Sequence, residues 1–219
     1  MSVASLLNIV PGQRVLDLTG AKSLELAEAL LSEAPDGLLV ANNATVPQRL
    51  CGVVAFTKCP PQRFPELYEA SGEVLKFDRV VCHMASSGDE ARLQPWHMHP
   101  LQLRALQRGL NALAVGGRLL YSTLSSNVIE NEAVVASALA TSEAVLLELN
   151  HCKDWQPEAV SLTWPVPDPR SGAAFHSWEE VPPKARGKVL QTMFPVRVEG
   201  LQRCLRASNG SAAFQHVAV

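Results

Sequence analysis

Apolar and polar residues alternate with two different periods along the first two thirds of the chain. Short runs rich in Val, Leu and Ile predict strands, and the segments between them repeat apolar residues every three or four positions, as amphipathic helices do. The predicted strands are residues 14–18, 38–42, 77–82, 118–122 and 144–149, and the predicted helices are 24–34, a short one from Pro47, about 100–114 and one after Asn127. Strands that alternate with helices are typical of a parallel sheet covered by helices, so the pattern predicts an α/β fold.

The last third of the chain differs in composition. Six prolines and three tryptophans fall between residues 154 and 187, where aliphatic runs are few, and this predicts a long ordered excursion over the surface. Alternating apolar residues over 212–219 predict a final strand. We therefore expect a single domain over residues 1–219, with the excursion 154–187 inside it.

The charge balance limits the kind of partner. The chain has 19 Lys and Arg against 21 Asp and Glu, a net charge of −2, and is 47% hydrophobic. These values exclude a disordered chain and a strongly basic nucleic-acid binder, so affinity for RNA would need a local patch. Six cations lie between residues 184 and 206 against one acid, and they form either a solvated face or a phosphate-contacting surface. These RNA-binding candidates are Lys184, Arg186, Lys188, Arg197, Arg203 and Arg206.

Other chemical patterns are weak. The five cysteines are an odd number without a C-x-x-C pair, which argues against a disulfide framework or a zinc ribbon. His97 and His99 flank Met98 and have no third ligand nearby, so we expect a solvated loop and no metal. The Cys82-His83 pair fits a buried structural cysteine better than a reactive one. No apolar run reaches the about 20 residues of a membrane span, and no signal segment is recognisable, which leaves the intracellular compartment open between cytoplasm, nucleus and mitochondrion.

Common ligand-binding fingerprints are missing. The sequence has no G-x-G-x-x-G, no G-x-x-x-x-G-K-[ST] and no G-x-S-x-G. The polar residues 86–89 follow the third clear strand, where α/β sheets place ligands, but a plain polar loop explains them nearly as well.

A more specific indication comes from nine stretches that occur in family order over nearly the whole chain. They resemble the Nop/Sun family of RNA 5-methylcytosine methyltransferases, especially its tRNA-modifying branch. The stretches are 13–18, 37–42, 77–82, 87–89, 101–104, 115–123, 129–135, 193–195 and 203–206. The resemblance implies a Rossmann-like class I methyltransferase fold: a seven-stranded, mostly parallel sheet with an antiparallel last strand and helices on both faces.

The same resemblance implies catalysis by two cysteines. One, in a Thr-Cys pair, attacks carbon 6 of cytosine so that carbon 5 can take a methyl group from S-adenosylmethionine, and the other, in a Pro-Cys pair, helps to release the enzyme. Here Leu124 follows Thr123, and Ser86 follows Ala85. The family aspartate before the Pro-Cys pair is His83. A leucine is no nucleophile and a serine hydroxyl is far weaker than a thiol, so we expect no catalytic residues.

The implied cofactor site is altered as well. The family stretch Asp-Leu-Cys-Ala-Ala-Pro-Gly-Ser-Lys is represented by the shorter 17–23, which lacks the Pro-Gly turn. The acid expected to bind the ribose hydroxyls is Asn43, the next acidic position is Thr45, and the Asp-Ala pair is Cys59-Pro60. Asp17, Lys22 and Asn43 would form a vestigial pocket, since an amide lacks the charge-assisted strength of a carboxylate.

These differences predict a catalytically inactive methyltransferase-like protein with no cofactor. It would serve as a structural or RNA- and protein-binding part of a larger protein or ribonucleoprotein assembly that processes RNA, modifies tRNA or relates to the ribosome. Because the match starts at the sheet domain, we expect the family's N-terminal RNA-recognition region to be absent. The alternative is a divergent but active S-adenosylmethionine-dependent RNA cytosine-5 methyltransferase.

Overall fold

The structure is a computed structural model, and it groups the chain into two compact units. The first unit contains residues 1–84, 104–121 and 216–219, and the second contains 85–103 and 122–215. The structure describes residues 2–31, 37–44, 54–90, 92–147, 162–199, 201, 205–206 and 213–218, the last two ranges and residue 31 by their backbone alone. The predicted helix from Pro47 lies outside these residues.

The first unit is built on parallel strands. The strands β1 (Arg14–Asp17), β2 (Leu38–Asn42) and β4 (Phe77–His83) match the predicted runs closely. The strand β3 (Val54–Thr57) was not predicted. β1 pairs in parallel with β2 and with β4, and β2 pairs in parallel with β3. Their registers bring the carboxyl ends of β1, β2 and β3 to one edge of the sheet.

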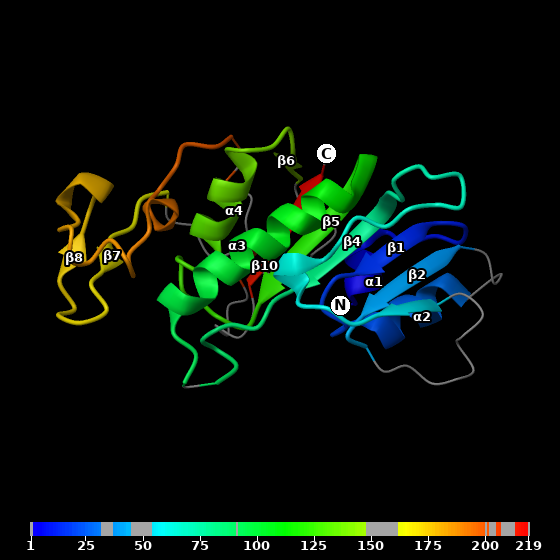
Figure 1. The fold of residues 1–219 in the computed structure, drawn as a ribbon, viewed down its shortest axis with the longest axis horizontal. Helices are drawn as coiled ribbons and strands as arrows, with labels where there is room; N and C mark the ends of the chain where they lie inside the picture. Colours follow the sequence, from blue (N-terminus) through cyan, green and yellow to red (C-terminus); the bar gives the residue numbers. More distant parts are fainter. Residues whose placement is uncertain are drawn as a thin grey trace. The chain divides into compact units, whose positions relative to one another are not determined.

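Two helices of the first unit pack on one another and on this sheet. The helix α2 (Ser23–Leu31) contacts β1 and β2, and the short α1 (Val3–Leu7) contacts α2 (Figure 1). The buried residues of α2 include Leu26, Ala27 and Leu30, whereas Leu24, which the helical spacing placed on the same face as Ala27 and Leu30, is 44% exposed. A 3₁₀ helix, η2 (Pro61–Arg63), follows β3.

The long helix α3 (Pro95–Ala112) begins about five residues before the predicted start. Pro95 suits the first helical position, because its missing N–H would be unpaired there anyway. Pro100 inside the helix costs one backbone hydrogen bond, yet burial of Met98 and His99 holds the first turns in place. The prediction of a solvated loop at 97–99 is therefore wrong.

The rest of α3 follows its sequence pattern. Leu103, Leu106 and Leu110 are buried, whereas Arg104 and Arg108 are exposed. Strand β5 (Leu113–Thr123) begins directly after the helix, earlier than predicted. No helix in the described ranges is long and apolar enough to span a membrane.

The sheet has the strand order β3-β2-β1-β4-β5-β10-β6, with β9 paired to β10 outside this path. Here β6 is Val145–Leu146, β9 is Leu205–Arg206 and β10 is Ala213–Ala218. The described part of the sheet thus has eight strands, one more than expected, because the chain adds β9 antiparallel to β10. A doubly wound order in which β1 lies inside the sheet confirms the predicted α/β class.

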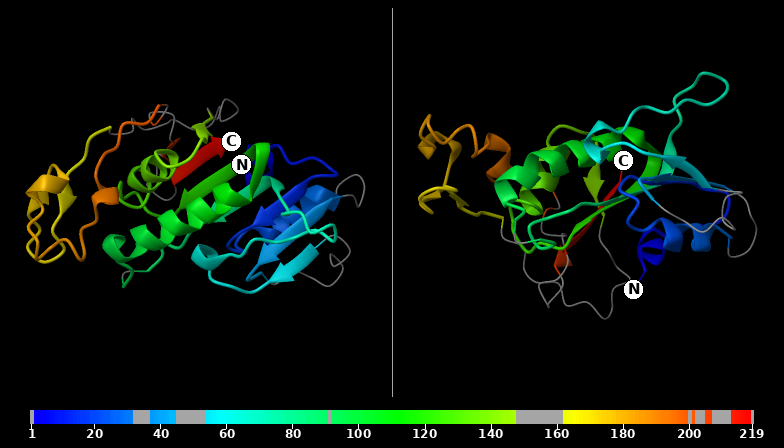
Figure 2. Two further views of the ribbon diagram at one scale, coloured as in Figure 1. Left: turned by 45° about the horizontal axis from the view of Figure 1, so that its top comes forward. Right: turned by 60° about the horizontal axis from the view of Figure 1, so that its bottom comes forward.

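The second unit contains α4 (Glu132–Leu139), a helix buried on all sides, and a segment with little regular structure. That segment holds a small hairpin, β7 (Val166–Pro167) with β8 (Ala174–Phe175), and the 3₁₀ helices η3 (Trp178–Glu180) and η4 (Gln191–Met193) (Figure 2). η4 packs on α4, and the Trp164 Nε1 donates to the Met193 carbonyl at 2.8 Å. The described part of the predicted excursion is therefore tied to itself by the β7–β8 hairpin and to η4 by the Trp164 side chain.

His99 gives the second unit a pH dependence that can be measured. Its ring is fully buried, with Nδ1 2.6 Å from the Ile129 carbonyl and Nε2 2.9 Å from Thr192 Oγ1. Burial lowers the pKa of His99 from 6.5 to about 4, against the opposing effects of the Ile129 carbonyl and the Glu130 charge. The unfolded chain therefore binds a proton at a higher pH than the folded chain.

We expect the free energy of unfolding to fall by roughly 2–3 kcal/mol as the pH drops from 6.5 to 4, since each pKa unit is about 1.4 kcal/mol. Above pH 6.5 this contribution is fully present. Urea unfolding at several pH values should show this loss in the natural chain. His99→Gln lowers stability at all pH values but flattens the slope, and an equal slope in both proteins would contradict the role of His99.

Candidate functional site

Ser86 and Leu124, which occupy the positions of the two family cysteines, lie side by side in the second unit. The Leu124 backbone N–H donates to Ser86 Oγ at 3.2 Å. The backbone N–H and hydroxyl of Ser86 both donate to Asp89 Oδ2, at 2.6 and 2.7 Å. Ser86 is fully buried, whereas Leu124 is 40% exposed. The Ser86 hydroxyl is the only side-chain heteroatom of these two residues. It is buried and already hydrogen-bonded.

The loop at 86–89 is packed backbone to backbone against the end of β5. A Cβ added at Gly88 would lie 1.9 Å from the Leu124 carbonyl oxygen, so no side chain fits there. Only glycine, which has no Cβ, lets the backbone of the loop lie this close to the Leu124 carbonyl.

A buried polar network fixes the same loop. Glu130 accepts from the Ser87 N–H at 2.9 Å and from the Ser87 hydroxyl, and Gln102 Nε2 donates to Glu130 Oε1 at 3.1 Å. Gln102 also donates to the Ala85 carbonyl at 2.9 Å. In the sequence, Glu130 and Gln102 are marked only by their membership of the stretches 129–135 and 101–104. Hydrogen bonds of Glu130 and Gln102 thus hold residues 85–87 in place, and no cysteine takes part in these hydrogen bonds.

Neither of the two cysteines that the structure describes, Cys59 and Cys82, is an activated nucleophile. Cys82 lies fully buried in β4, as predicted, and burial together with the charge of Asp17 raises the pKa of its thiol. Cys59 is partly exposed, and burial raises the pKa of its thiol too, opposed by a hydrogen bond to Asn42. Both shifts disfavour the thiolate, which is the reactive form. His83, the last residue of β4, is half-buried.

In the first unit, Asp17 organises the turn from β1 into α2. Its Oδ1 accepts from the N–H groups of Thr19 and Gly20, at 3.2 and 2.9 Å, and its Oδ2 accepts from the Lys22 N–H at 2.9 Å and the Ser23 hydroxyl at 2.7 Å. Asp17 is fully buried. Its carboxylate thus binds the chain itself, and Lys22 contributes its backbone to this turn.

Asn43, in the position of the ribose-binding acid, is likewise engaged with the chain. It has a left-handed backbone with φ of 61°, and its Nδ2 donates to the Cys59 carbonyl at 2.7 Å. The neighbouring Asn42 is buried and bonds the carbonyls of Leu18 and Cys59 and the Cys59 N–H, at 2.9, 2.9 and 3.0 Å. The role of Asn42 was not predicted from the sequence. Its one signal was that it is a polar residue at the end of an apolar strand.

The turn after β1 also closes against the end of β2. Gly20 has φ of +80°, and a Cβ there would lie 2.4 Å from the Asn42 carbonyl oxygen. Three strand ends and the glycine turn are thereby held against one another by backbone contacts and two asparagine amides. Protein atoms fill the space between the glycine turn and the β2 end.

The predicted basic residues do not all serve the same purpose. Lys184, Lys188 and Arg197 are exposed. Arg186 places its guanidinium 5.0 Å from the ring centroid of Trp178, and its Nε donates to the Val181 carbonyl at 3.0 Å. Arg203 and the side chain of Arg206 lie outside the described residues.

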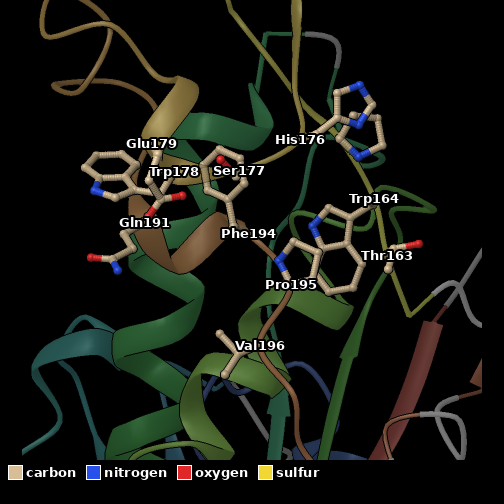
Figure 3. Close-up of a pocket in the computed structure, with 11 residues that line it drawn as sticks. Thr163, Trp164, His176, Ser177, Trp178, Glu179, Gln191, Phe194, Pro195 and Val196 are labelled. Carbon is tan, nitrogen blue, oxygen red and sulfur yellow. The ribbon is translucent and has the colours of Figure 1, made fainter.

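An aromatic pocket of about 670 Å³ lies beside this basic segment in the second unit. Trp178 and Phe194 line one side and Trp164 and His176 the other, with Gln191 and Glu179 at the same pocket (Figure 3). Sequence analysis missed this pocket, although the tryptophans and prolines that build it had marked the segment as unusual.

The comparisons relate the chain to RNA-modifying enzymes. It is 29% identical to a tRNA (cytosine(34)-C(5))-methyltransferase of Drosophila melanogaster over 91% of its length, and 33% identical to a multisite-specific tRNA:(cytosine-C(5))-methyltransferase of Saccharomyces cerevisiae over 74%. It covers 32% and 29% of these relatives, so it spans about a third of their length. No family model matches the chain.

Solved structures agree on the fold. A methyltransferase homologue from Pyrococcus horikoshii aligns over 99% of this chain and 66% of its own, with a TM-score of 0.57 and 20% identity. NSun6 from the same organism aligns over 98% of this chain and 50% of its own, with a TM-score of 0.60 and 15% identity. These similarities confirm the predicted Rossmann-like methyltransferase fold.

Homologues of this chain are thus tRNA cytosine-5 methyltransferases. The relatives favour the alternative of an active RNA methyltransferase over the catalytically inactive protein that the residue losses predict. The two interpretations now depend on what the site itself can do.

Proposed function

We propose that this chain is an RNA-directed module of the tRNA cytosine-5 methyltransferase type in which methyl transfer to cytosine has been lost. Its relatives by sequence support the RNA part of the proposal. The observation that carries the loss is the Ser86–Leu124 pair: the loops meet as the resemblance implies, but they present a buried hydroxyl and an alkyl side chain. The module would act by binding within a larger protein or ribonucleoprotein assembly.

The chemistry of the site supports a loss of methyl transfer, because an accessible nucleophile is missing at both family cysteine positions. Attack on carbon 6 of cytosine requires a nucleophile, and a leucine side chain has no lone pair to donate. A serine hydroxyl needs an adjacent base for activation. The Asp89 carboxylate accepts from the Ser86 hydroxyl and is such a base, but Ser86 is fully buried. The hydroxyl therefore cannot reach a cytosine without rearrangement of the polar network.

The first unit also fits S-adenosylmethionine poorly. The position expected to bind the ribose hydroxyls is an amide that donates to Cys59, and the glycine turn lies against the Asn42 carbonyl. The carboxylate of Asp17 is saturated by its own turn. We therefore propose that the chain binds no S-adenosylmethionine.

The second candidate is a divergent but active RNA cytosine-5 methyltransferase. The sequence relationship to enzymes that carry this activity favours it. It requires a nucleophile that the described arrangement of residues 86 and 124 does not offer. Either a cysteine elsewhere in the chain or a rearranged 86–89 loop would have to supply that nucleophile.

One experiment separates the two candidates. We expect the purified chain to incorporate no labelled methyl groups from S-adenosylmethionine into tRNA, and to form no covalent adduct with RNA that contains 5-fluorocytosine. An active relative on the same RNA is the positive control. Methyl incorporation, or an adduct that a Cys→Ser substitution abolishes, would overturn the inactive proposal and establish the second candidate.

A further inference from the structure

The aromatic pocket has the surface that an unpaired base needs. Trp178 is partly exposed, and Arg186 covers one face of its indole. Phe194 packs edge-to-face on Trp178, with ring centroids 6.3 Å apart and an interplanar angle of 67°. Trp164 is fixed by its hydrogen bond to Met193. Trp164 and Phe194 are buried, and Phe194 supports the partly exposed Trp178, whose indole a flat ligand would meet.

A second, smaller pocket of about 150 Å³ lies in the same segment and is cationic. Arg170, Lys184 and Lys188 line it together with Asp168. The Asp168 carboxylate accepts from the Arg170 N–H at 2.7 Å, and this bond lowers the pKa of Asp168. Asp168 thus keeps its negative charge within its own turn, and the three cationic side chains outnumber it and leave the pocket a net positive charge for an anion.

The β7–β8 hairpin connects the two pockets. The aromatic pocket contacts its open end at Pro165 and His176, and the cationic pocket contacts its turn at Asp168 and Ser171. Val166 pairs with Phe175 and Pro167 with Ala174. From Pro165 to Asp168 the strand advances about 10 Å, at about 3.3 Å per residue. A stretch of a few nucleotides can span that distance.

We propose that these two pockets bind single-stranded RNA, with an unpaired base against Trp178 and a neighbouring phosphate at Arg170, Lys184 and Lys188. This inference rests on the proposed RNA-directed function and names where the strand binds. Stacking on aromatic rings combined with a positively charged groove is the general way in which proteins hold single strands. It assigns Arg170 and Trp178 to RNA binding, and it gives Arg186 the separate task of positioning the indole.

The charge pattern favours RNA over a peptide. Proline-rich peptides also dock on aromatic grooves, but they carry no repeated anion. The cationic pocket, a few residues away along the hairpin, supplies the positive charge that a phosphate backbone requires. A peptide partner is therefore an outcome that the experiment must be able to reveal.

The test measures binding of the whole chain to a fluorescent, unstructured RNA oligonucleotide and to an abasic oligonucleotide with the same phosphates. We expect Trp178→Ala to weaken RNA binding roughly 5- to 100-fold, and Trp178→Phe to retain much of it, because base stacking tolerates any aromatic ring. The abasic strand should bind the natural chain about as weakly as RNA binds Trp178→Ala. Lys184→Glu with Lys188→Glu should lower the slope of log affinity against log salt by about 1.4, or about 0.7 per contact.

Arg104→Glu, an exposed charge reversal on α3, is the matched control and should leave the affinity unchanged. Thermal unfolding shows whether each variant is folded. If the natural chain binds RNA and the folded Trp178 and lysine variants bind it equally, the two-pocket proposal is overturned while RNA binding stands. If the natural chain binds no RNA, both proposals fail, and preferential binding of a proline-rich peptide at Trp178 overturns the RNA assignment.

Discussion

Asp17→Ala is expected to reduce the free energy of unfolding by roughly 3–5 kcal/mol. The substitution leaves the N–H groups of Thr19, Gly20 and Lys22 and the Ser23 hydroxyl without their acceptor. Each buried group that loses its partner costs about 1–3 kcal/mol. Three of the four hydrogen bonds are only partly buried, so the loss is smaller than four full penalties. The measurement is urea unfolding followed by circular dichroism, with the natural chain alongside.

Asp78→Ala is the matched control. Asp78 accepts one exposed hydrogen bond, from the Arg14 N–H at 2.8 Å. Its removal should cost about 1 kcal/mol or less, since water replaces an exposed partner. Asp17→Asn keeps one acceptor oxygen and should fall between the two. Equal losses for Asp17→Ala and Asp78→Ala would contradict the view that Asp17 serves the fold.

The strands β1, β2 and β4 could be predicted because each is a short apolar run that ends at a polar residue, whereas β3 was not predicted. The match of β2 with the predicted residues 38–42 illustrates this. The start of α3 could not be predicted, because Pro100 and two histidines argue locally against a helix. Its early start depends on tertiary contacts: His99 is bonded to Ile129 and Thr192, which lie 30 and 93 residues further along the chain.

The candidate site also contains positions that could be predicted from the sequence and positions that could not. The resemblance identified Ser86 and Leu124 as the positions of the two family cysteines, and the structure places them in hydrogen-bond contact. It could not identify Asn42 or Glu130, because their roles arise from residues distant in sequence that fold around them. The aromatic pocket was invisible for a further reason: its rings come from positions 164, 178 and 194, which share no period.

Restoring both cysteines is expected to leave the chain inactive, because S-adenosylmethionine lacks a site. Replacing a carboxylate by an amide removes a charged hydrogen-bond partner worth about 1.5–3 kcal/mol. Two altered positions, Asn43 and Cys59-Pro60, therefore weaken binding roughly a hundredfold or more, at 1.4 kcal/mol for each factor of ten. The contact of Gly20 with the Asn42 carbonyl adds a steric obstacle that no single substitution removes. Leu124→Cys with Ser86→Cys would thus add thiols that have no methyl donor.

Calorimetry and thermal-shift titration with S-adenosylmethionine and its demethylated product measure this directly. A ligand at a hundred times its Kd stabilises the folded state by about 2.7 kcal/mol, so binding in the micromolar range would raise the unfolding temperature visibly. We expect no such rise for the natural chain. Asn43→Asp restores a carboxylate, which the left-handed backbone at this position tolerates, and should recover no more than about a hundredfold in affinity. Micromolar binding by the natural chain would show that the glycine turn opens for the cofactor, and activity of the two-cysteine variant would show that the loss concerns the nucleophiles alone.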